Sequence, residues 1–383
     1  QRAIVAREGF INFAMQEQPD GVLIEVQRRA LHELGLEDRV IQQLIFEDES
    51  DLSEKTDTKE KRIRQIFSIP MPLKHTTKTL ECAVTNYQKF YKFGQPYIFK
   101  YPKHLIGVEV EVENVVFIDH NIPLVFWDIE NDGSLRNNGR EFKNKGALPI
   151  QYIQYALEQL FQGINEDVDF SPRTSIHVHL DVRGMTLPQL LGLLYTYIVL
   201  EPLLFKFAGL SRKTSIYCVP LNDSDILTNV AGIVEFQSVI SAPNAYWHKY
   251  SALNLLPVTD LGTIEFRHLP GTNDVNKILI WIDMISRLKG FTYKHSLNEI
   301  IEIISKLNTN SAYHDFITLV FDDLTKYLDC SDINRSLEKP VHLVKNCTII
   351  NTFNKFINDA NNFNTNSSLS KLLNISTNWE ATY

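Results

Sequence analysis

Strict alternation of apolar and polar residues predicts four β-strands in this chain. Successive side chains of a strand point to opposite faces, so alternation gives each strand one apolar and one polar face. In the first stretch valine alternates with glutamate, and in the last one threonine, glutamate and arginine alternate with apolar residues. The four predicted strands are residues 108–113, 140–143, 176–183 and 263–267.

Apolar residues at a spacing of three and four predict helices that follow these strands. Three of them, residues 150–161, 187–207 and 276–288, would pack on the apolar face of one antiparallel sheet. The helix at 187–207 follows Thr186, has proline in its first turn and is apolar nearly all round, so it should be buried. The expected fold is α+β: an antiparallel sheet with a concave functional face, packed on helices.

Changes in composition divide the chain into three parts. Residues 1–102 are expected to form a mostly helical accessory region, and residues 103–295 the sheet with its helices. Residues 296–383 are expected to form a helical annex whose tail is rich in Asn, Ser and Thr. The helices predicted outside the central part are residues 21–36, 80–93, 297–307 and 312–328.

Composition restricts the functions that the chain can have. Of its 383 residues, 44% are hydrophobic and 22% are charged, as in an ordinary globular protein. The formal net charge of −8 argues against binding to nucleic acid or to an anionic membrane. No stretch is expected to span a membrane, since Glu201 and Lys206 interrupt the longest apolar one, 187–207.

The cysteines and the overall composition suggest a compartment. Four cysteines occur without a CxxC pair, so we expect neither a disulfide scaffold nor a zinc site. The content of Asn, Ile and Lys is typical of an AT-rich genome. We therefore expect a cytoplasmic protein of a bacterium or of a phage-infected host.

The polar faces of the predicted strands carry residues that bind metal ions and phosphates. No basic residue is interleaved with the glutamates of the first strand, which suggests that a cation neutralises them. Each pattern also has an ordinary explanation: a solvated edge strand, a structural histidine or an ion pair. The residues concerned are Glu109, Glu111, Glu113, Glu141, His177, His179, Glu265 and Arg267.

A single sheet would bring these residues together on its polar face. Carboxylates gathered so closely need divalent cations, and oxygen ligands without cysteine favour Mg²⁺ or Mn²⁺ over zinc. The loop with Arg212 and Lys213 either compensates the end of the preceding helix or holds nucleotide phosphates. Asp132 lies in the turn sequence NDGS, and turn formation is its expected role.

Five motifs of the chain, in this order and spacing, resemble those of a known family. They are GVEVEVE, NDGSL followed by GREF, SIHVHL, the buried helix with Glu201, and GTIEFRHLPGT. They are similar to the amidoligase family within the glutamine-synthetase and glutamate–cysteine-ligase-like superfamily of carboxylate–amine ligases. The resemblance covers roughly residues 105–294 and implies a glutamine-synthetase-like catalytic fold.

The resemblance implies a metal site and its ligands. Glu109 and Glu111 would each serve a different Mg²⁺ ion, with Mn²⁺ as an alternative. Glu141 would join one ion, and His177 and Glu265 would join the other.

It also implies which residues contact ATP and substrate. Arg267, beside Glu265, would contact the transferred phosphoryl group or the substrate carboxylate, and His179 would lie beside the nucleotide or substrate. Arg212 and Lys213 would bind the phosphates of ATP, and Asn254 would contact the substrate or ATP.

The implied reaction is the ATP-dependent joining of a carboxylate and an amine. ATP converts the carboxylate into an acyl phosphate, and an amine then attacks to give an amide, ADP and phosphate. The substrates would be small molecules or peptides, and the N-terminal region would contact a protein partner. Residues 215–249 would supply a lid that excludes water.

Two other functions stay open at this point. The chain could keep the fold without the activity and serve as a structural or binding component, for example of a viral particle. Alternatively, His177 and His179 could act with the carboxylates as a metal-dependent hydrolase that needs no ATP.

Overall fold

The computed structural model describes residues 92–118, 126–164, 167–224 and 247–347, together with Val84 and Leu124. The helix predicted at 21–36, nearly all of that at 80–93, the Asn-rich tail and most of the expected lid lie outside the described residues. The division into three parts stays a prediction.

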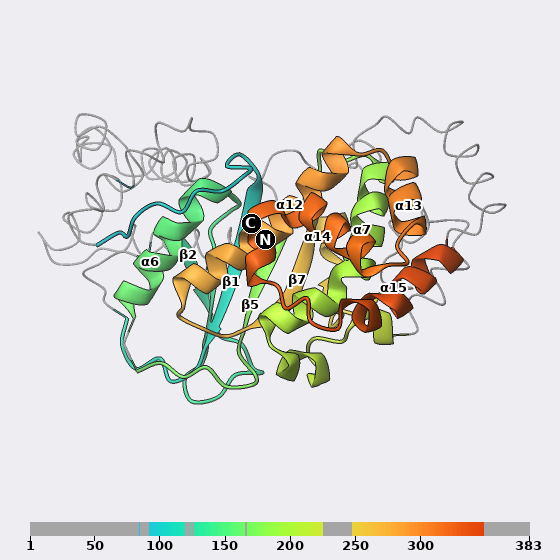
Figure 1. Ribbon diagram of the computed structural model, residues 1–383. Helices are drawn as coiled ribbons and strands as arrows, with labels where there is room; N and C mark the ends of the chain where they lie inside the picture. Colours follow the sequence, from blue (N-terminus) through green and yellow to red (C-terminus); the bar gives the residue numbers. More distant parts are fainter. Residues whose placement is uncertain are drawn as a thin grey trace, which may run out of the picture.

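A seven-stranded antiparallel sheet forms the centre of the molecule (Figure 1). Its order is β2-β3-β1-β5-β7-β6, and β4 pairs with β1 beside β3. This confirms the predicted α+β fold and makes neighbours of the four predicted strands, with β2, β4 and β6 added. The strands are β1 (Leu105–Val112), β2 (Trp127–Glu130), β3 (Arg140–Asn144), β4 (Leu148–Pro149), β5 (Ser175–Asp181), β6 (Leu253–Asn254) and β7 (Thr263–Pro270).

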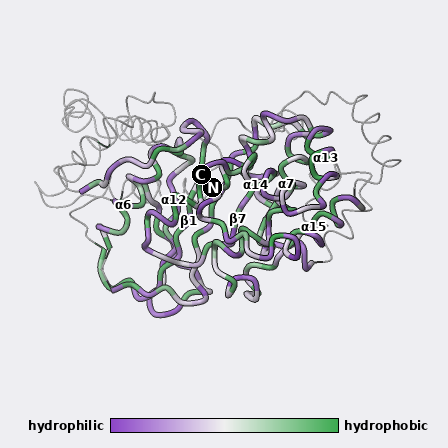
Figure 2. Tube along the Cα trace, in the orientation of Figure 1, coloured by the Kyte–Doolittle hydropathy of each residue, from purple (hydrophilic) through white to green (hydrophobic). Residues whose placement is uncertain are grey.

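Helices cover the apolar face of this sheet. A short turn of 3-10 helix leads into α6 (Ile153–Gly163), while α7 (Leu187–Ala208) packs on β7 and α12 (Val275–Lys294) packs on β5, α6 and α7. The inward side chains of β1, β5 and β7 alternate as predicted and are almost inaccessible to solvent. Along the trace in Figure 2, hydrophobic and hydrophilic positions alternate over short distances, as expected of elements with one buried face.

The central helix α7 begins with a capping box. The Thr186 hydroxyl accepts a hydrogen bond from the Gln189 N–H, and the Gln189 side chain accepts one from the Thr186 N–H. Contrary to our expectation, α7 is long and apolar enough to cross a membrane by length and composition alone. However, 83% of its most apolar window is buried inside the molecule, as in the core helix of a globular fold.

Three helices after α12 share the hydrophobic core of the sheet. Helices α13 (Leu297–Ser305) and α14 (Asn310–Phe321) lie where helices were predicted, and a 3-10 turn (Asp322–Tyr327) completes the second prediction. Helix α15 (Ile333–Cys347), which was not predicted, packs on α7, α13 and α14. Its buried residues recur at helical spacing, and they are Ile333, Leu337, Val341 and Val344.

Three short helices lie close to β7 or α7. They are η2 (Leu210–Thr214), η3 (Leu221–Asp223) and α11 (Pro257–Asp260). Helices η2 and α11 contact β7, and η3 contacts α7.

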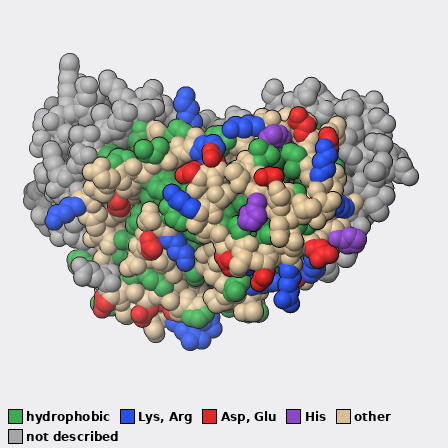
Figure 3. Space-filling model, viewed as in Figure 1, with side chains coloured by type: hydrophobic (Ala, Val, Ile, Leu, Met, Phe, Trp, Pro, Cys, Tyr) green, Lys and Arg blue, Asp and Glu red, His purple; other side chains and the backbone are tan. Residues whose placement is uncertain are grey.

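Acidic and basic side chains are interspersed on the face of the molecule drawn in Figure 3.

Candidate active site

The register of the sheet determines which polar side chains meet. In an antiparallel sheet, directly opposite residues project from the same face. Glu109 on β1 lies opposite His177 on β5, and His179 lies opposite Glu265 on β7. Glu111 lies opposite Glu141 on β3. Six of the predicted residues therefore share one face, while Glu113 lies beyond the end of β1 and bridges to Asp169.

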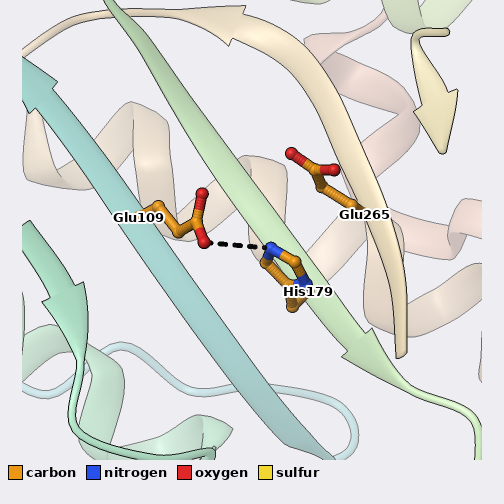
Figure 4. Close-up of side chains that lie close together, drawn as sticks. All are labelled: Glu109, His179 and Glu265. Carbon is orange, nitrogen blue, oxygen red and sulfur yellow. Dashed lines mark ion pairs between the residues drawn. The ribbon is translucent and has the colours of Figure 1, made fainter. Parts of the chain in front are cut away.

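Glu109, His179 and Glu265 form the centre of the site (Figure 4). One ligand atom from each of the three lies within 4.8 Å of the others. His179 Nδ1 is 3.0 Å from the Thr263 hydroxyl, and His179 Nε2 points at Glu109 Oε1, 3.4 Å away. This buried Nε2 has no hydrogen-bond partner among the described residues. A histidine held at one nitrogen, with the other facing carboxylates, is the usual arrangement of a metal ligand.

His177 is held in a similar way from the other side. The Ser175 hydroxyl donates to Glu111 Oε2 over 2.6 Å, so it accepts from His177 Nε2, which is 2.7 Å away. His177 Nδ1 forms a hydrogen bond of 3.2 Å with Glu109 Oε2 and lies 3.3 Å from Glu265 Oε1. Without its proton, Nδ1 would direct a lone pair at the space between these two carboxylates, which suits a bound cation.

Two further groups of three could hold a cation. Glu109, Glu141 and His177 form one, and Glu111, Asp132 and Glu141 form the other. Asp132 also forms the predicted turn, because its Oδ1 accepts from the Ser134 N–H over 2.7 Å. The sequence reasoning missed it as a ligand candidate; the signal was that the turn follows β2 and precedes Glu141 on β3.

The carboxylates around the site have unequal affinities for protons. Burial acts to raise the pKa of Glu109, but the His179 and His177 rings outweigh it and hold that pKa well below its usual range. Burial and the Glu109 carboxylate raise the pKa of Glu141 to about 8, although Lys143 acts against them. Burial acts to lower the pKa of His179, but the Glu109 carboxylate outweighs it, so that pKa lies above its usual value. A cation bound here would therefore displace protons.

Arg267 lies at the β7 side of the group and pairs with Glu265. Burial would raise the pKa of Glu265, but the Arg267 guanidinium lowers it below the ordinary value. The Asn254 side chain donates to Glu265 Oε2 over 2.6 Å. Asn254 therefore orients this carboxylate from the neighbouring strand.

Arg212 and Lys213, predicted together as phosphate ligands, lie in different surroundings. The buried Arg212 guanidinium donates to the main-chain oxygens of Arg267 and His268, over 2.9 and 3.2 Å. Its Nη1 has no hydrogen-bond partner among the described residues. Lys213 is half exposed and pairs with Asp223 at 3.2 Å. Only Arg212 thus lies beside the strand that carries Arg267.

Lys143 was not expected in the site. No basic residue is interleaved with the glutamates within the first strand, from which we predicted a neutralising cation, but Lys143 lies opposite Glu109 on β3. Its Nζ is 2.9 Å from Glu141 Oε2. It lies two residues beyond Glu141 on the same strand, so the alternation of side chains already placed it on this face.

The comparisons with known proteins agree with the motifs. Residues 126–289 match the family model described as "putative amidoligase enzyme". The match extends from β2 through most of α12 and includes Asp132, Glu141, both histidines, Glu265 and Arg267, while Glu109 and Glu111 on β1 precede it. No curated protein matches the chain. The region from β2 to α12 is thus similar to the amidoligase family, in agreement with the motifs.

Proposed function

We propose that this protein is an ATP-dependent carboxylate–amine ligase that forms an amide through an acyl phosphate. The observation that carries the proposal is the convergence of three groups of Glu, Asp and His on one sheet face, beside Arg267, in a chain whose residues 126–289 match the amidoligase model. Such a face suits a bound nucleotide because its carboxylates can hold the cations that accompany phosphates.

The donor set fits Mg²⁺ or Mn²⁺. The ligand atoms are carboxylate oxygens and imidazole nitrogens, with no cysteine, and the buried Nε2 of His179 faces Glu109 Oε1 at 3.4 Å. Glu109, His179 and Glu265 would hold one ion, and Glu141 with Glu109 and His177, or with Glu111 and Asp132, would hold another. When bound, these ions would neutralise phosphate charge and align the phosphoryl group for transfer.

The protein's own residues would supply orientation and charge compensation. Arg267 would neutralise charge on the phosphoryl group as it moves to the substrate carboxylate. Glu265 holds the Arg267 guanidinium, and Asn254 holds Glu265. The Arg212 guanidinium donates to two carbonyls of β7 and would stabilise the part of this strand that carries Arg267.

Calorimetric titration with Mg²⁺–ATP tests this proposal. We expect binding that depends on the cation and is weakened at least about tenfold in Glu265→Gln, because a cation ligand is lost and Arg267 loses its partner. Glu302→Gln, on the exposed side of α13, is the matched control and should bind as the parent does.

Phosphate release would then be measured with mixtures of carboxylates and amines. Release that requires both substrates and ATP supports the ligase. Absence of nucleotide binding by the parent protein contradicts it and favours a structural or binding role. Cation-dependent hydrolysis of a phosphoester or a peptide bond without nucleotide would favour the hydrolase.

A further inference from the structure

Lys143 occupies a position between two carboxylates at the edge of the candidate site. Its Nζ lies 2.9 Å from Glu141 Oε2 and 3.2 Å from Glu130 Oε2. The Lys143 side chain is 21% exposed, and those of Glu141 and Glu130 are 10% and 26% exposed. The ammonium group is therefore neither fully solvated nor fixed to a single acceptor.

The register of β2, β3 and β1 explains this position. Glu130, Glu141 and Glu111 lie side by side on three neighbouring strands. Lys143 lies in the next row, opposite Glu109. Among the described residues, Lys143 is the lysine that forms an ion pair with Glu141, and it already donates a hydrogen bond to Glu130 Oε2 over 3.2 Å. A small rotation of its flexible stem can therefore take the ammonium group away from Glu141 while the bond to Glu130 is kept.

Glu141 is needed by two of the three groups that could hold a cation. An ammonium group within hydrogen-bonding distance takes up one of its oxygens and places a positive charge where a divalent ion would approach. Like charges repel strongly in a partly buried site, so the ammonium group and the ion cannot both remain close to Glu141.

We propose that Lys143 is a tethered counter-ion that competes with a divalent cation for Glu141, and that it leaves Glu141 and stays paired with Glu130 alone when the cation binds. The inference rests on the proposed function only in that it needs the site to bind cations. In this scheme Glu130, outside all three candidate groups, is the acceptor that allows the exchange.

Three substitutions separate this role from a structural one. Lys143→Met keeps an unbranched apolar stem but removes the charge, so the cation should bind more tightly. Lys143→Arg keeps the charge and should bind as weakly as the parent. Glu130→Gln removes the negative charge that receives Lys143, so the ammonium group stays on Glu141 and the cation should bind more weakly.

Titration of the full chain with Mn²⁺ alone, followed by calorimetry, gives the affinity and number of bound ions. We expect the weakest ion to bind about tenfold or more tightly in Lys143→Met, since one neighbouring charge changes an ionisation equilibrium by that factor or more. Glu130→Gln should bind it several-fold more weakly. Lys339→Met and Glu302→Gln make the same changes of net charge at exposed ion pairs elsewhere and should remain close to the parent.

The outcomes are distinguishable. If the parent binds Mn²⁺ and Lys143→Met, with an unchanged circular dichroism spectrum, binds it equally or more weakly, the competition is wrong. A folded Glu130→Gln variant that binds more tightly than the parent also overturns it. If neither the parent nor Lys143→Met binds Mn²⁺, the metal site of the proposed function fails and the competition fails with it. Binding by Lys143→Met alone supports the competition.

Discussion

Asp132 makes two kinds of contact from one side chain. Its Oδ1 accepts a hydrogen bond from the Ser134 N–H, which stabilises the turn, and it lies with Glu111 and Glu141 in a group that could hold a cation. Asparagine can make the same turn without a charge. The two functions of this residue can therefore be separated by substitution.

We expect Asp132→Asn to fold with nearly the stability of the parent. It should bind Mn²⁺ less tightly at the position formed by Glu111, Asp132 and Glu141. Asp132→Ala should also bind less tightly, and it should lose about 1 kcal/mol of stability because the turn hydrogen bond is gone. Urea unfolding and Mn²⁺ titration measure the two effects. Parent-like affinity and ion number in Asp132→Asn would exclude Asp132 as a ligand.

From the sequence, the sheet face on which a side chain lies is easier to predict than the side chains that it contacts. Because the side-chain period of a strand is two, alternation alone placed Glu109, His177 and Glu265 on the polar face. The cross-strand partners depend on register, which loops and turns set over many residues. Asp132 lies in a loop without alternation, so only the folded β2–β3 connection brings it beside Glu111.

Among the elements, helix α7 shows how a first turn stabilises a whole helix. Thr186 and Gln189 satisfy each other's main-chain N–H groups, which have no partner within the helix. The helix that follows packs against β7, α12, α13 and α15. A weakened start of α7 should therefore lower the stability of the whole fold.

We expect Thr186→Ala to reduce the free energy of unfolding by about 1 kcal/mol, the typical loss on removing a capping side chain. Thr186→Ser keeps the hydroxyl and is the matched control. The midpoint of urea unfolding measures the difference. If the alanine variant unfolds at the same urea concentration as the serine variant, the cap contributes nothing to stability.

Long elements with a regular period were predictable, and short ones were not. The patterns at 150–161, 187–207 and 276–288 matched real helices because each is long and has buried apolar residues at helical spacing. Strands β4 and β6 have two residues each and contain too little sequence for a period. Helix α15 contains Pro340 and many polar residues, which concealed the spacing of its four buried positions.

A buried network connects parts of the whole molecule that are distant in sequence. The Glu201 carboxylate on α7 accepts hydrogen bonds from the Tyr197 hydroxyl and from the N–H groups of Leu221 and Asn222. Tyr197 also contacts His268 on β7, at 2.9 Å. Burial raises the pKa of Glu201 to about 7, even though these three hydrogen bonds lower it.

Global stability should therefore vary with pH through Glu201. A carboxyl group with a raised pKa binds a proton in the folded state that the unfolded chain has already lost, so its ionisation destabilises the fold. The stability of the parent relative to Glu201→Gln should fall as pH rises from 4.5 to about 7 and should be constant above that. Thermal unfolding of both proteins at several pH values measures this; a difference that does not change with pH would contradict the shift.

The core position of α7 also has a consequence for biosynthesis. Two of the helices that cover it, α13 and α15, come later in the chain, and α15 ends about 140 residues after α7. At 5–20 residues per second, a ribosome needs roughly 7 to 28 s to make that stretch. During this interval the nascent chain carries a helix that by length and composition could enter a lipid bilayer. Holdase chaperones that bind apolar segments would thus have their strongest effect on this protein between the synthesis of α7 and that of α15.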